Sequence, residues 1–435
     1  MSLKLVVIGG GSSYTPEIIE GIINRAASLP ISEITLVDIE EGLDKLTIIG
    51  RLSRRMIEKS ALNIKLEWTT DRRSALQDAD FVSTQIRVGG LNARKLDERI
   101  PLKYGYIGQE TNGAGGIFKA FRTIPVLMDI ASDIHEICPD AWMINFTNPA
   151  GIVTEALLKH GKHKKVIGVC NIPYNMKESV SEVLNVPADT VTIEFTGLNH
   201  YVFGTKVEVN GTDRLDEVLD ALKEGTGDYS PANIVNLGWS RQFLDAFHAL
   251  PNPYHQYYFQ TKEVLKKDTD AYQENGTRAE QVMALESSLF KLYQDEDLNV
   301  KPAELEERGG AYYSDVACSL MNSLHNDTGD IQTVNVQNDG TLPFLADDAV
   351  IETNCVITKN GAVPLERSVV PASISGLIYS MKHFETLVID SAVSGCYDTA
   401  YLAMMNNPLV QNEKDAKDIL DELLNAHKVH LPQFN

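Results

Sequence analysis

Short apolar runs alternate with segments of helical spacing through the first part of the chain. Unbroken apolar runs suit strands buried on both faces, and apolar residues three or four positions apart suit helices that cover a sheet. Strands are predicted at 3–8, 34–38, 64–68, 80–86, 142–146 and 165–169, and helices at 16–28, 44–59, 71–77 and 117–137. This alternation predicts an α/β fold with a doubly wound parallel sheet.

The second half of the chain follows a mixed pattern. Strands are predicted at 191–195, 202–209, 333–337 and 349–357, and helices at 214–223, 278–293, 305–324, 385–405 and 413–427. The chain has 435 residues, which exceeds the roughly 250–300 residues that one core usually supports. Two domains are therefore expected, a parallel α/β domain over 1–169 and a mixed α+β domain over 170–435.

Residues 91–116 interrupt the alternation of the first half. This stretch carries several charged residues and ends in the glycine-rich sequence 105–116. A long glycine-rich loop with charged residues is typical of a segment that covers an active site, and a mobile surface loop is the alternative.

The first strand runs into a turn of small residues, which are Gly9, Gly10, Gly11, Ser12 and Ser13. Glycines let the backbone turn sharply and approach a ligand closely. Thr15 is expected to cap the helix that follows, and a helix N-terminus favours an anion. The combination predicts a site for the diphosphate of a dinucleotide. Tyr14 stands where the motif has a third small residue, and a turn that binds nothing is the alternative.

The predicted second strand ends at Asp38, 27 positions after Gly11 (38 − 11). An acid about 20 residues beyond the glycines binds ribose hydroxyls in dinucleotide-binding domains. Asp38 is therefore a candidate cofactor contact, and a helix cap is the alternative.

Composition limits the partners. The net charge of −21 argues against nucleic acid and against an anionic membrane, and an anionic substrate would need a local basic pocket. The five cysteines are scattered, which suits a reducing cytoplasm. The first strand begins too early to leave room for a signal peptide, and no apolar run is long enough for a membrane span.

Two residues could bind a metal ion. Cys170 and His200 offer a thiolate and an imidazole, which suit zinc or a softer transition metal. Their separation of 30 positions (200 − 170) matches no local metal motif. A buried cysteine and a core histidine are the alternative.

Two further segments carry candidate chemistry. The aromatic stretch 251–259 contains Tyr254, which could act as a base if a cation lowered its pKa, and a packing cluster is the alternative. Arg278 begins a predicted helix and could bind a phosphate there. A surface pair with Glu274 or Glu280 is the alternative for Arg278.

Several motifs recur together along nearly the whole chain. They are Gly9-Gly10-Gly11-Ser12, residues 86–90 (IRVGG), 108–111 (GQET), 145–149 (NFTNP), 170–173 (CNIP), 197–200 (GLNH) and the tyrosines at 254, 257 and 258. In this order they resemble glycoside hydrolase family 4, whose members are NAD- and Mn²⁺-dependent phosphoglycosidases and an exception to two-carboxylate hydrolysis. The resemblance implies a Rossmann-like first domain of the lactate and malate dehydrogenase type, and a second domain for metal, substrate and oligomer contacts.

The resemblance also implies a mechanism. NAD would take a hydride from C3 of the sugar, Tyr254 would remove the C2 proton, the aglycone would leave from C1, water would add, and the cofactor would then return the hydride. Cys170 and His200 would hold Mn²⁺ or another divalent transition metal, and Glu110 would assist Tyr254. Gly9 to Ser13, Asp38 and Arg87 would contact NAD.

Substrate contacts also follow from the resemblance. They would come from Arg94, Asn148, Asn171 and Arg278, with Arg278 at the 6-phosphate. The α-acting members carry Cys-Asp where this chain has Cys170-Asn171, so the β-acting branch is implied, with a phosphorylated disaccharide or aryl glucoside as substrate. Because Asn171 cannot protonate a leaving group, the acid stays unidentified. The aromatic stretch 251–259 and the acidic surface permit a homodimer or homotetramer.

Two other functions are compatible with an NAD-binding first domain of this kind. An NAD-dependent dehydrogenase of a hydroxy acid or sugar acid would accumulate NADH, whereas a phosphoglycosidase would not. A non-catalytic NAD sensor would tolerate Tyr254→Phe. The set of motifs favours the phosphoglycosidase.

Overall fold

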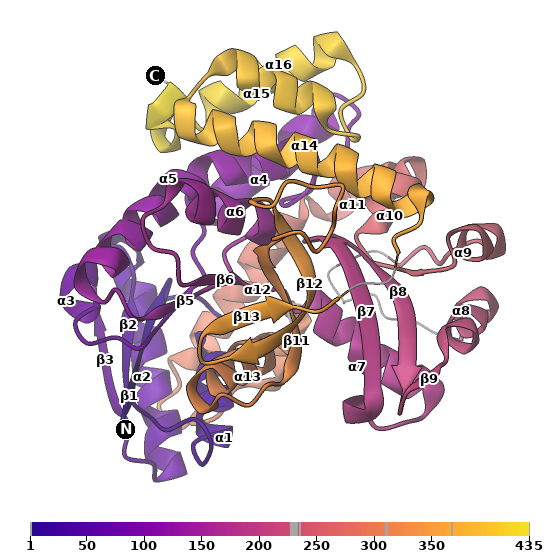
Figure 1. The fold of residues 1–435 in the computed structure, drawn as a ribbon. Helices are drawn as coiled ribbons and strands as arrows, with labels where there is room; N and C mark the ends of the chain where they lie inside the picture. The colour runs from indigo at the N-terminus through magenta and orange to yellow at the C-terminus, as the bar shows by residue number, and fades with distance from the viewer. Residues whose placement is uncertain (1, 227–233, 235, 309–311, 367–368, 435) are drawn as a thin grey trace.

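One mixed sheet passes through the whole molecule (Figure 1). The computed structural model describes residues 2–226, 234, 236–308, 312–366 and 369–434. The order along the sheet is β10-β8-β7-β12-β11-β6-β5-β4-β1-β2-β3, with β13 beside β12 and β9 beside β8. The strands are β1 (Leu3–Ile8), β2 (Ile31–Val37), β3 (Lys65–Thr69), β4 (Phe81–Thr84), β5 (Trp142–Asn145), β6 (Val166–Gly168), β7 (Val191–Leu198), β8 (Tyr201–Val209), β9 (Thr212–Asp213), β10 (Leu250–Pro251), β11 (Ile331–Gln337), β12 (Val350–Thr358) and β13 (Gly361–Pro364).

Sixteen α-helices surround the sheet in the described part of the chain. They are α1 (Thr15–Asn24), α2 (Leu43–Ser60), α3 (Arg72–Ala75), α4 (Gly90–Lys103), α5 (Gly113–Ile137), α6 (Ala150–His160), α7 (Ile172–Leu184), α8 (Leu215–Glu224), α9 (Arg241–Phe247), α10 (His255–Phe259), α11 (Thr261–Asn275), α12 (Arg278–Tyr293), α13 (Tyr313–Asn326), α14 (Ala372–Ser394), α15 (Tyr397–Asn406) and α16 (Glu413–Ala426). None of these helices combines the length and the apolar character that crossing a bilayer requires.

The six strands β1 to β6 are parallel and have helices on both faces. Alternate side chains of β1 enter two different cores: Leu5 and Val7 pack with α1, α2, α12 and α13, whereas Val6 and Ile8 pack with α5, α6 and the C-terminal helices. This arrangement is the predicted doubly wound sheet. The strand registers align their carboxyl ends, so Gly9, Asp38, Gln85 and Phe146 leave the sheet at one edge.

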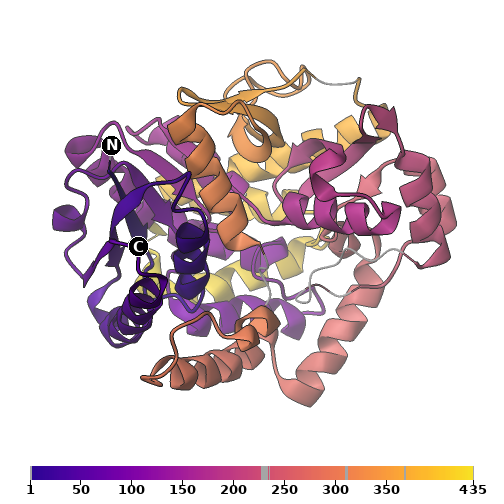
Figure 2. The ribbon, with the colours of Figure 1, turned by 90° about the horizontal axis from the view of Figure 1, so that it is seen from below.

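The rest of the sheet is antiparallel. β11 pairs with β6 through Asn335 and Gly168, and β12, β7 and β8 follow in order. The sheet therefore continues past the predicted domain boundary at 169/170, which stays a prediction. The indigo N-terminal segment with β1, β2 and β3 and the magenta-to-pink segment around β7, β8, α7 and α8 lie on opposite sides of the molecule (Figures 1 and 2). Helices α14, α15 and α16 form a layer over α4 and α5 (Figure 1).

The prediction of a loop at 91–116 is wrong, because most of this segment is helical. Residues 90–103 form α4, and α5 already begins at Gly113, so only a short connection remains between them. The periodicity of α4 is hidden because its buried face includes the charged residues Asp97 and Glu98, which are paired inside the protein.

Three smaller predictions are also wrong. Thr15 is the first residue of α1 rather than its cap, and its hydroxyl donates to the Gly10 carbonyl (2.9 Å). The helix predicted at 305–324 is a short 3₁₀ helix (Ala303–Arg308) followed by α13. The helix predicted at 385–405 is two helices, because Gly395 adopts a left-handed φ of 68° between α14 and α15. Sequence analysis also missed the helices α6, α7, α9, α10 and α11.

Candidate functional site

The glycine turn follows β1 directly and is held closely by the end of β2. The amides of Gly9 and Gly10 donate to the Val37 carbonyl (2.9 and 2.8 Å), and the Gly11 amide donates to Asp38 Oδ2 (2.8 Å). A Cβ atom on Gly11 would lie 2.7 Å from that same oxygen. The turn therefore requires a residue without a side chain, and it presents bare backbone ahead of α1, which fits the diphosphate of a dinucleotide.

Side chains far apart in the sequence hold the turn in place. Gln85 Nε2 donates to the Gly9 carbonyl (3.0 Å), and Tyr313 donates its hydroxyl to Gln85 Oε1 (2.9 Å). From α12, Glu286 accepts a hydrogen bond from Ser13 Oγ (3.2 Å), and the Tyr293 hydroxyl donates to the Ser13 carbonyl (2.9 Å). Both halves of the chain therefore shape the turn.

A buried carboxylate with three cations lies beside the end of β4. Glu110 Oε2 contacts Arg87 and accepts from Lys119 Nζ (2.7 Å), and Arg94 Nη1 lies 3.0 Å from Glu110 Oε1. Burial alone would raise the pKa of Glu110, but the three positive charges hold it well below its usual range. Burial and the charge of Arg87 lower the pKa of Lys119 to about 7. Glu110 is thus ionised, and it neutralises an otherwise strongly positive region.

Arg94 links this cluster to the start of α12. Its Nε donates to Glu98 Oε1 (2.6 Å), and Glu98 Oε2 accepts from the backbone amide of Ala279 (2.7 Å). Arg278 is half-buried there and donates to Gln281 (3.4 Å). Burial and the nearby charge of Arg94 lower the pKa of Arg278, so two guanidinium groups face one region. This arrangement suits an anion.

The alternative pairing of Arg278 with an acidic neighbour is not observed in the described residues. Glu280 instead completes a capping box, with Oε2 accepting from the Thr277 amide (2.8 Å). The arginine is thereby left to face the region shared with Arg94.

Cys170, His200 and Tyr254 come together from three segments. Cys170 follows β6, and burial together with the nearby negative charge of Glu352 raises the pKa of its thiol. The Tyr254 ring stacks on the His200 imidazole, with 3.8 Å between their centroids. Burial raises the pKa of Tyr254 well above its usual value, and the neighbouring Tyr257, Cys170 and Glu110 raise it further.

Two observations bear on whether a metal ion fits here. No group of three or more histidine, cysteine or acidic side chains in the described residues is placed to hold an ion. Burial and the charge of Lys119 lower the pKa of His200 to about 3, so its imidazole is neutral, as a metal ligand must be. Cys170 and His200 therefore have the donor chemistry of two metal ligands, and an ion held by them would take its remaining ligands from water or substrate.

Two buried features lie around these residues. A cavity of about 20 Å³ is lined by Thr111, Asn112, Asn199 and His200 among others. Glu352, on β12, accepts from Asn199 Nδ2 and Asn335 Nδ2 (both 3.0 Å), and burial raises its pKa to about 7.

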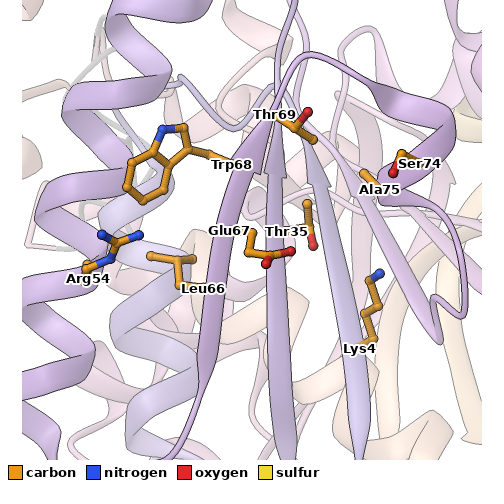
Figure 3. A pocket seen from close by; sticks show the side chains of 9 residues that line it. All are labelled: Lys4, Thr35, Arg54, Leu66, Glu67, Trp68, Thr69, Ser74 and Ala75. Atoms are coloured by element: carbon orange, nitrogen blue, oxygen red, sulfur yellow. The ribbon is translucent and has the colours of Figure 1, made fainter.

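A larger pocket lies elsewhere. It measures about 410 Å³ and lies along the edge of the parallel sheet, between Lys4, Glu67 and Trp68 (Figure 3). None of the residues predicted for the site lines this pocket.

The structure divides the predicted residues into neighbouring groups. Arg87, Arg94 and Glu110 are in contact, and Arg278 lies near Arg94. Gly9 to Ser13 form the glycine turn, which Asp38 supports. Asn148 accepts from the Ala150 amide (3.3 Å), and Asn171 immediately precedes α7. These residues come from the carboxyl-end edge of the sheet and from the start of α12.

Sequence analysis missed several neighbours of the site, which include Gln85, Glu98, Lys119, Glu286 and Glu352. The available signal for two of them was a charge inside an apolar segment. Lys119 stands between Phe118 and Ala120 in α5, and Glu352 stands in the buried strand β12. A buried charge of this kind requires a partner and so indicates a site.

Comparison with known proteins agrees with this geometry. Residues 4–186 match the profile of family 4 glycosyl hydrolases, and residues 195–410 match the C-terminal domain of that family. A probable 6-phospho-beta-glucosidase of Bacillus subtilis (strain 168) is 52% identical over 432 residues, which span 99% of this chain and 98% of that protein. The 6-phospho-beta-glucosidase of Escherichia coli (strain K12) is 47% identical over 99% of this chain and 97% of its own length.

Solved structures give the same result. The 6-phospho-beta glucosidase of Thermotoga maritima, determined with NAD and glucose-6-phosphate, superposes with a TM-score of 0.90 at 33% identity and covers 99% of each chain. Another crystal structure of that enzyme contains manganese as well. Malate dehydrogenase of Plasmodium falciparum superposes with a TM-score of 0.55 at 13% identity over 90% of this chain and 98% of that one, which confirms the predicted Rossmann-like fold. With both profiles matched and close relatives along its whole length, the chain belongs to glycosyl hydrolase family 4.

Proposed function

We propose that this protein is a 6-phospho-β-glucosidase that requires NAD and a divalent metal ion, Mn²⁺ or another transition metal. Its substrates would be 6-phosphorylated β-glucosides such as phosphorylated cellobiose or an aryl glucoside. The observation that carries the proposal is the stack of Tyr254 on His200 next to Cys170, which puts a candidate base against two candidate metal ligands. The full-length relatives with this activity support it.

NAD and the metal ion would both be held at the edge of the sheet where the parallel strands have their carboxyl ends. Gly9 to Ser13, Asp38 and Arg87 would hold NAD, which supplies a reversible oxidation at C3 of the sugar. Cys170 and His200 would hold the metal ion, which supplies Lewis-acid stabilisation of negative charge on the sugar oxygens.

Tyr254 would accept the C2 proton on its phenolic oxygen. Burial opposes ionisation of this tyrosine, so it needs a cation beside it, and an ion held by His200 would lie close to the stacked Tyr254 ring. Glu110 would assist Tyr254 from a position fixed by Arg87, Arg94 and Lys119.

The substrate would be oriented by Arg94, Asn148, Asn171 and Arg278. Arg278 and Arg94 would supply the positive charge that the 6-phosphate needs in a protein of net charge −21. Because an asparagine amide cannot donate a proton to a departing oxygen, Asn171 favours the β-linked substrates implied by the family resemblance.

The remaining parts of the proposal concern location and assembly. All five cysteines are free, and four of them are buried, which fits a protein of the reducing cytoplasm. We propose a homodimer or homotetramer as the working state, with a phosphorylated glycoside as the main partner and no role for nucleic acid or membranes.

The decisive experiment is hydrolysis of p-nitrophenyl β-D-glucoside 6-phosphate with Mn²⁺ and reductant, with and without NAD⁺. The α-anomer and the unphosphorylated glucoside serve as matched substrates, and NADH absorbance is followed in parallel. Release of nitrophenol from the β-phosphate alone, dependent on NAD⁺ and without lasting NADH, is the expected result. Steady NADH formation without glycoside cleavage would instead indicate a dehydrogenase.

A further inference from the structure

One arginine from the second half of the chain lies against the glycine turn. Arg308 ends the short 3₁₀ helix Ala303–Arg308, and the central carbon of its guanidinium lies 4.4 Å from the ring centroid of Tyr14. Tyr14 stands where the dinucleotide-binding motif has its third small residue, directly after Ser13. The departure from the motif and the arginine therefore meet at one place in the structure.

An acid shared with the turn holds Arg308. Its Nη2 donates to Glu286 Oε1 (2.6 Å), and the same oxygen accepts from Ser13 Oγ (3.2 Å). Lys45 Nζ lies 3.1 Å from the other oxygen of Glu286. Two cations and one carboxylate leave one surplus positive charge (2 − 1) beside a turn whose backbone suits an anion.

Arg308 keeps an unused hydrogen-bond donor inside the protein. Its side chain is only 10% exposed, yet its Nε has no hydrogen-bond partner in the part of the chain that the structure describes. A buried donor without a partner costs free energy, so its presence requires an explanation. A guanidinium presents its N–H groups as a rigid planar fork that matches the oxygens of a phosphate.

We propose that Arg308 binds the diphosphate of NAD, with Glu286 and Tyr14 holding its guanidinium beside the turn. This inference rests on the cofactor site of the proposed function and adds to it a residue from the second half of the chain. The backbone of the turn offers neutral amides, and Arg308 adds a full positive charge to them. Because its contacts lead to Ser13 and Tyr14, we assign Arg308 to the diphosphate and leave the sugar 6-phosphate to Arg278.

The test is calorimetric titration of the full-length protein with NAD, with ADP-ribose and with glucose 6-phosphate. ADP-ribose keeps the diphosphate of NAD and lacks the nicotinamide. Arg308→Gln should weaken the binding of NAD and of ADP-ribose alike, by about tenfold to a hundredfold, the usual contribution of a hydrogen bond to a charged group. Glucose 6-phosphate should bind this variant as it binds the wild type. Unchanged affinity for NAD, or a loss confined to glucose 6-phosphate, would overturn the inference and leave the proposed function intact.

A conservative variant guards against failure of Arg308→Gln to fold. Arg308→Lys keeps a positive charge beside Glu286 without the planar fork, so it should lose less NAD affinity than Arg308→Gln. Added salt should also weaken NAD binding more steeply in the wild type than in Arg308→Gln, because salt screens the charge that the variant lacks. Equal salt dependence in the two proteins would contradict a contact between this charge and the cofactor.

Glu286→Gln shows whether Arg308 acts only by shaping the turn. Glutamine keeps an oxygen that can accept from Ser13 Oγ, but it removes the negative charge. If Arg308 binds the diphosphate, NAD should bind this variant at least as tightly as it binds the wild type. A loss as large as that of Arg308→Gln would mean that the ion pair itself shapes the turn, and would overturn the inference.

Arg25→Gln is the matched control. Arg25 Nη2 lies 2.5 Å from Asp315 Oδ1 and, like Arg308, joins the first half of the chain to the second, but it stands just after the end of α1. This variant should lower the thermal midpoint and leave NAD affinity near that of the wild type. An equal loss of NAD affinity here would overturn the inference, because any weakened contact between the two halves would then have the same effect. A wild-type protein that does not bind NAD would instead overturn the cofactor role in the proposed function, and the inference with it.

Discussion

The rings of Tyr254 and His200 lie nearly parallel, with 3.8 Å between the centroids and 6° between the ring planes. Tyr254 precedes α10, and His200 lies between β7 and β8 with a left-handed φ of 61°. The two side chains thus come from segments about 50 residues apart, and each limits the rotation of the other. A base held this way is oriented before the substrate binds.

Replacing Tyr254 with phenylalanine should separate catalysis from binding. The phenyl ring keeps the stack on His200 but removes the oxygen that would take the C2 proton. We expect kcat to fall by about 10²–10⁴-fold, the usual contribution of a general base, with NAD affinity nearly unchanged. Steady-state kinetics and NAD titration would measure both. Tyr257→Phe is the control, and unchanged kcat in Tyr254→Phe would assign the base to another group.

Local patterns in the sequence predict one part of the candidate site. The glycine turn and Asp38 stand out because a buried strand, a turn and a helix start are encoded by adjacent residues. The structure adds the bond from the Gly11 amide to Asp38, which joins residues on neighbouring strands.

Other parts depend on contacts that no local pattern reveals. Residues 90–103 read as a loop because Asp97 and Glu98 occupy the buried face of α4, and their partners Arg122 and Arg94 include one residue from another helix. Glu352 was missed because its hydrogen-bond partners, Asn199 in the β7–β8 turn and Asn335 on β11, are far from it in the sequence. Cys170 and His200 could be linked only through the family resemblance.

Reversing the charge at Arg278 should weaken substrate binding selectively. A hydrogen bond to a charged group contributes about 1.5–3 kcal/mol, so Arg278→Glu should raise KM for the phosphorylated substrate by about tenfold or more. Arg99→Glu makes the same charge change at an exposed position of α4 and serves as the control. An equal loss of NAD affinity in Arg278→Glu would point to misfolding rather than to a lost phosphate contact.

Removing the charge of Glu110 should destabilise the protein. Glu110→Gln leaves the buried Lys119 and the partly buried Arg87 and Arg94 without their shared counter-charge. Breaking a buried pair in this way costs about 3–5 kcal/mol, which urea denaturation would detect. Glu422→Gln removes a more exposed partner of Lys103 and should change the midpoint little. Equal midpoints for the two variants would contradict the importance of the buried cluster.

Metal removal should abolish activity reversibly. If Cys170 and His200 hold the ion, a chelator should stop turnover and added Mn²⁺ should restore it, whereas Cys170→Ser should stay inactive at ordinary metal concentrations. Cys396→Ser changes an exposed cysteine and should behave as the wild type. Full activity in a preparation shown to be metal-free would remove the metal from the mechanism.

His255 should make stability depend on pH below neutrality. It is fully buried, its Nδ1 accepts from the Asn252 amide (3.1 Å), and burial lowers its pKa to about 3. The unfolded chain takes up a proton at about pH 6.5, but the folded protein does not, so this contribution is complete above about pH 6.5 and is lost as the pH falls toward 3. The loss should approach about 1.4 kcal/mol per pH unit. Urea midpoints at several pH values would show a smaller decline in His255→Gln, because glutamine does not titrate, and parallel declines in the two proteins would contradict this account.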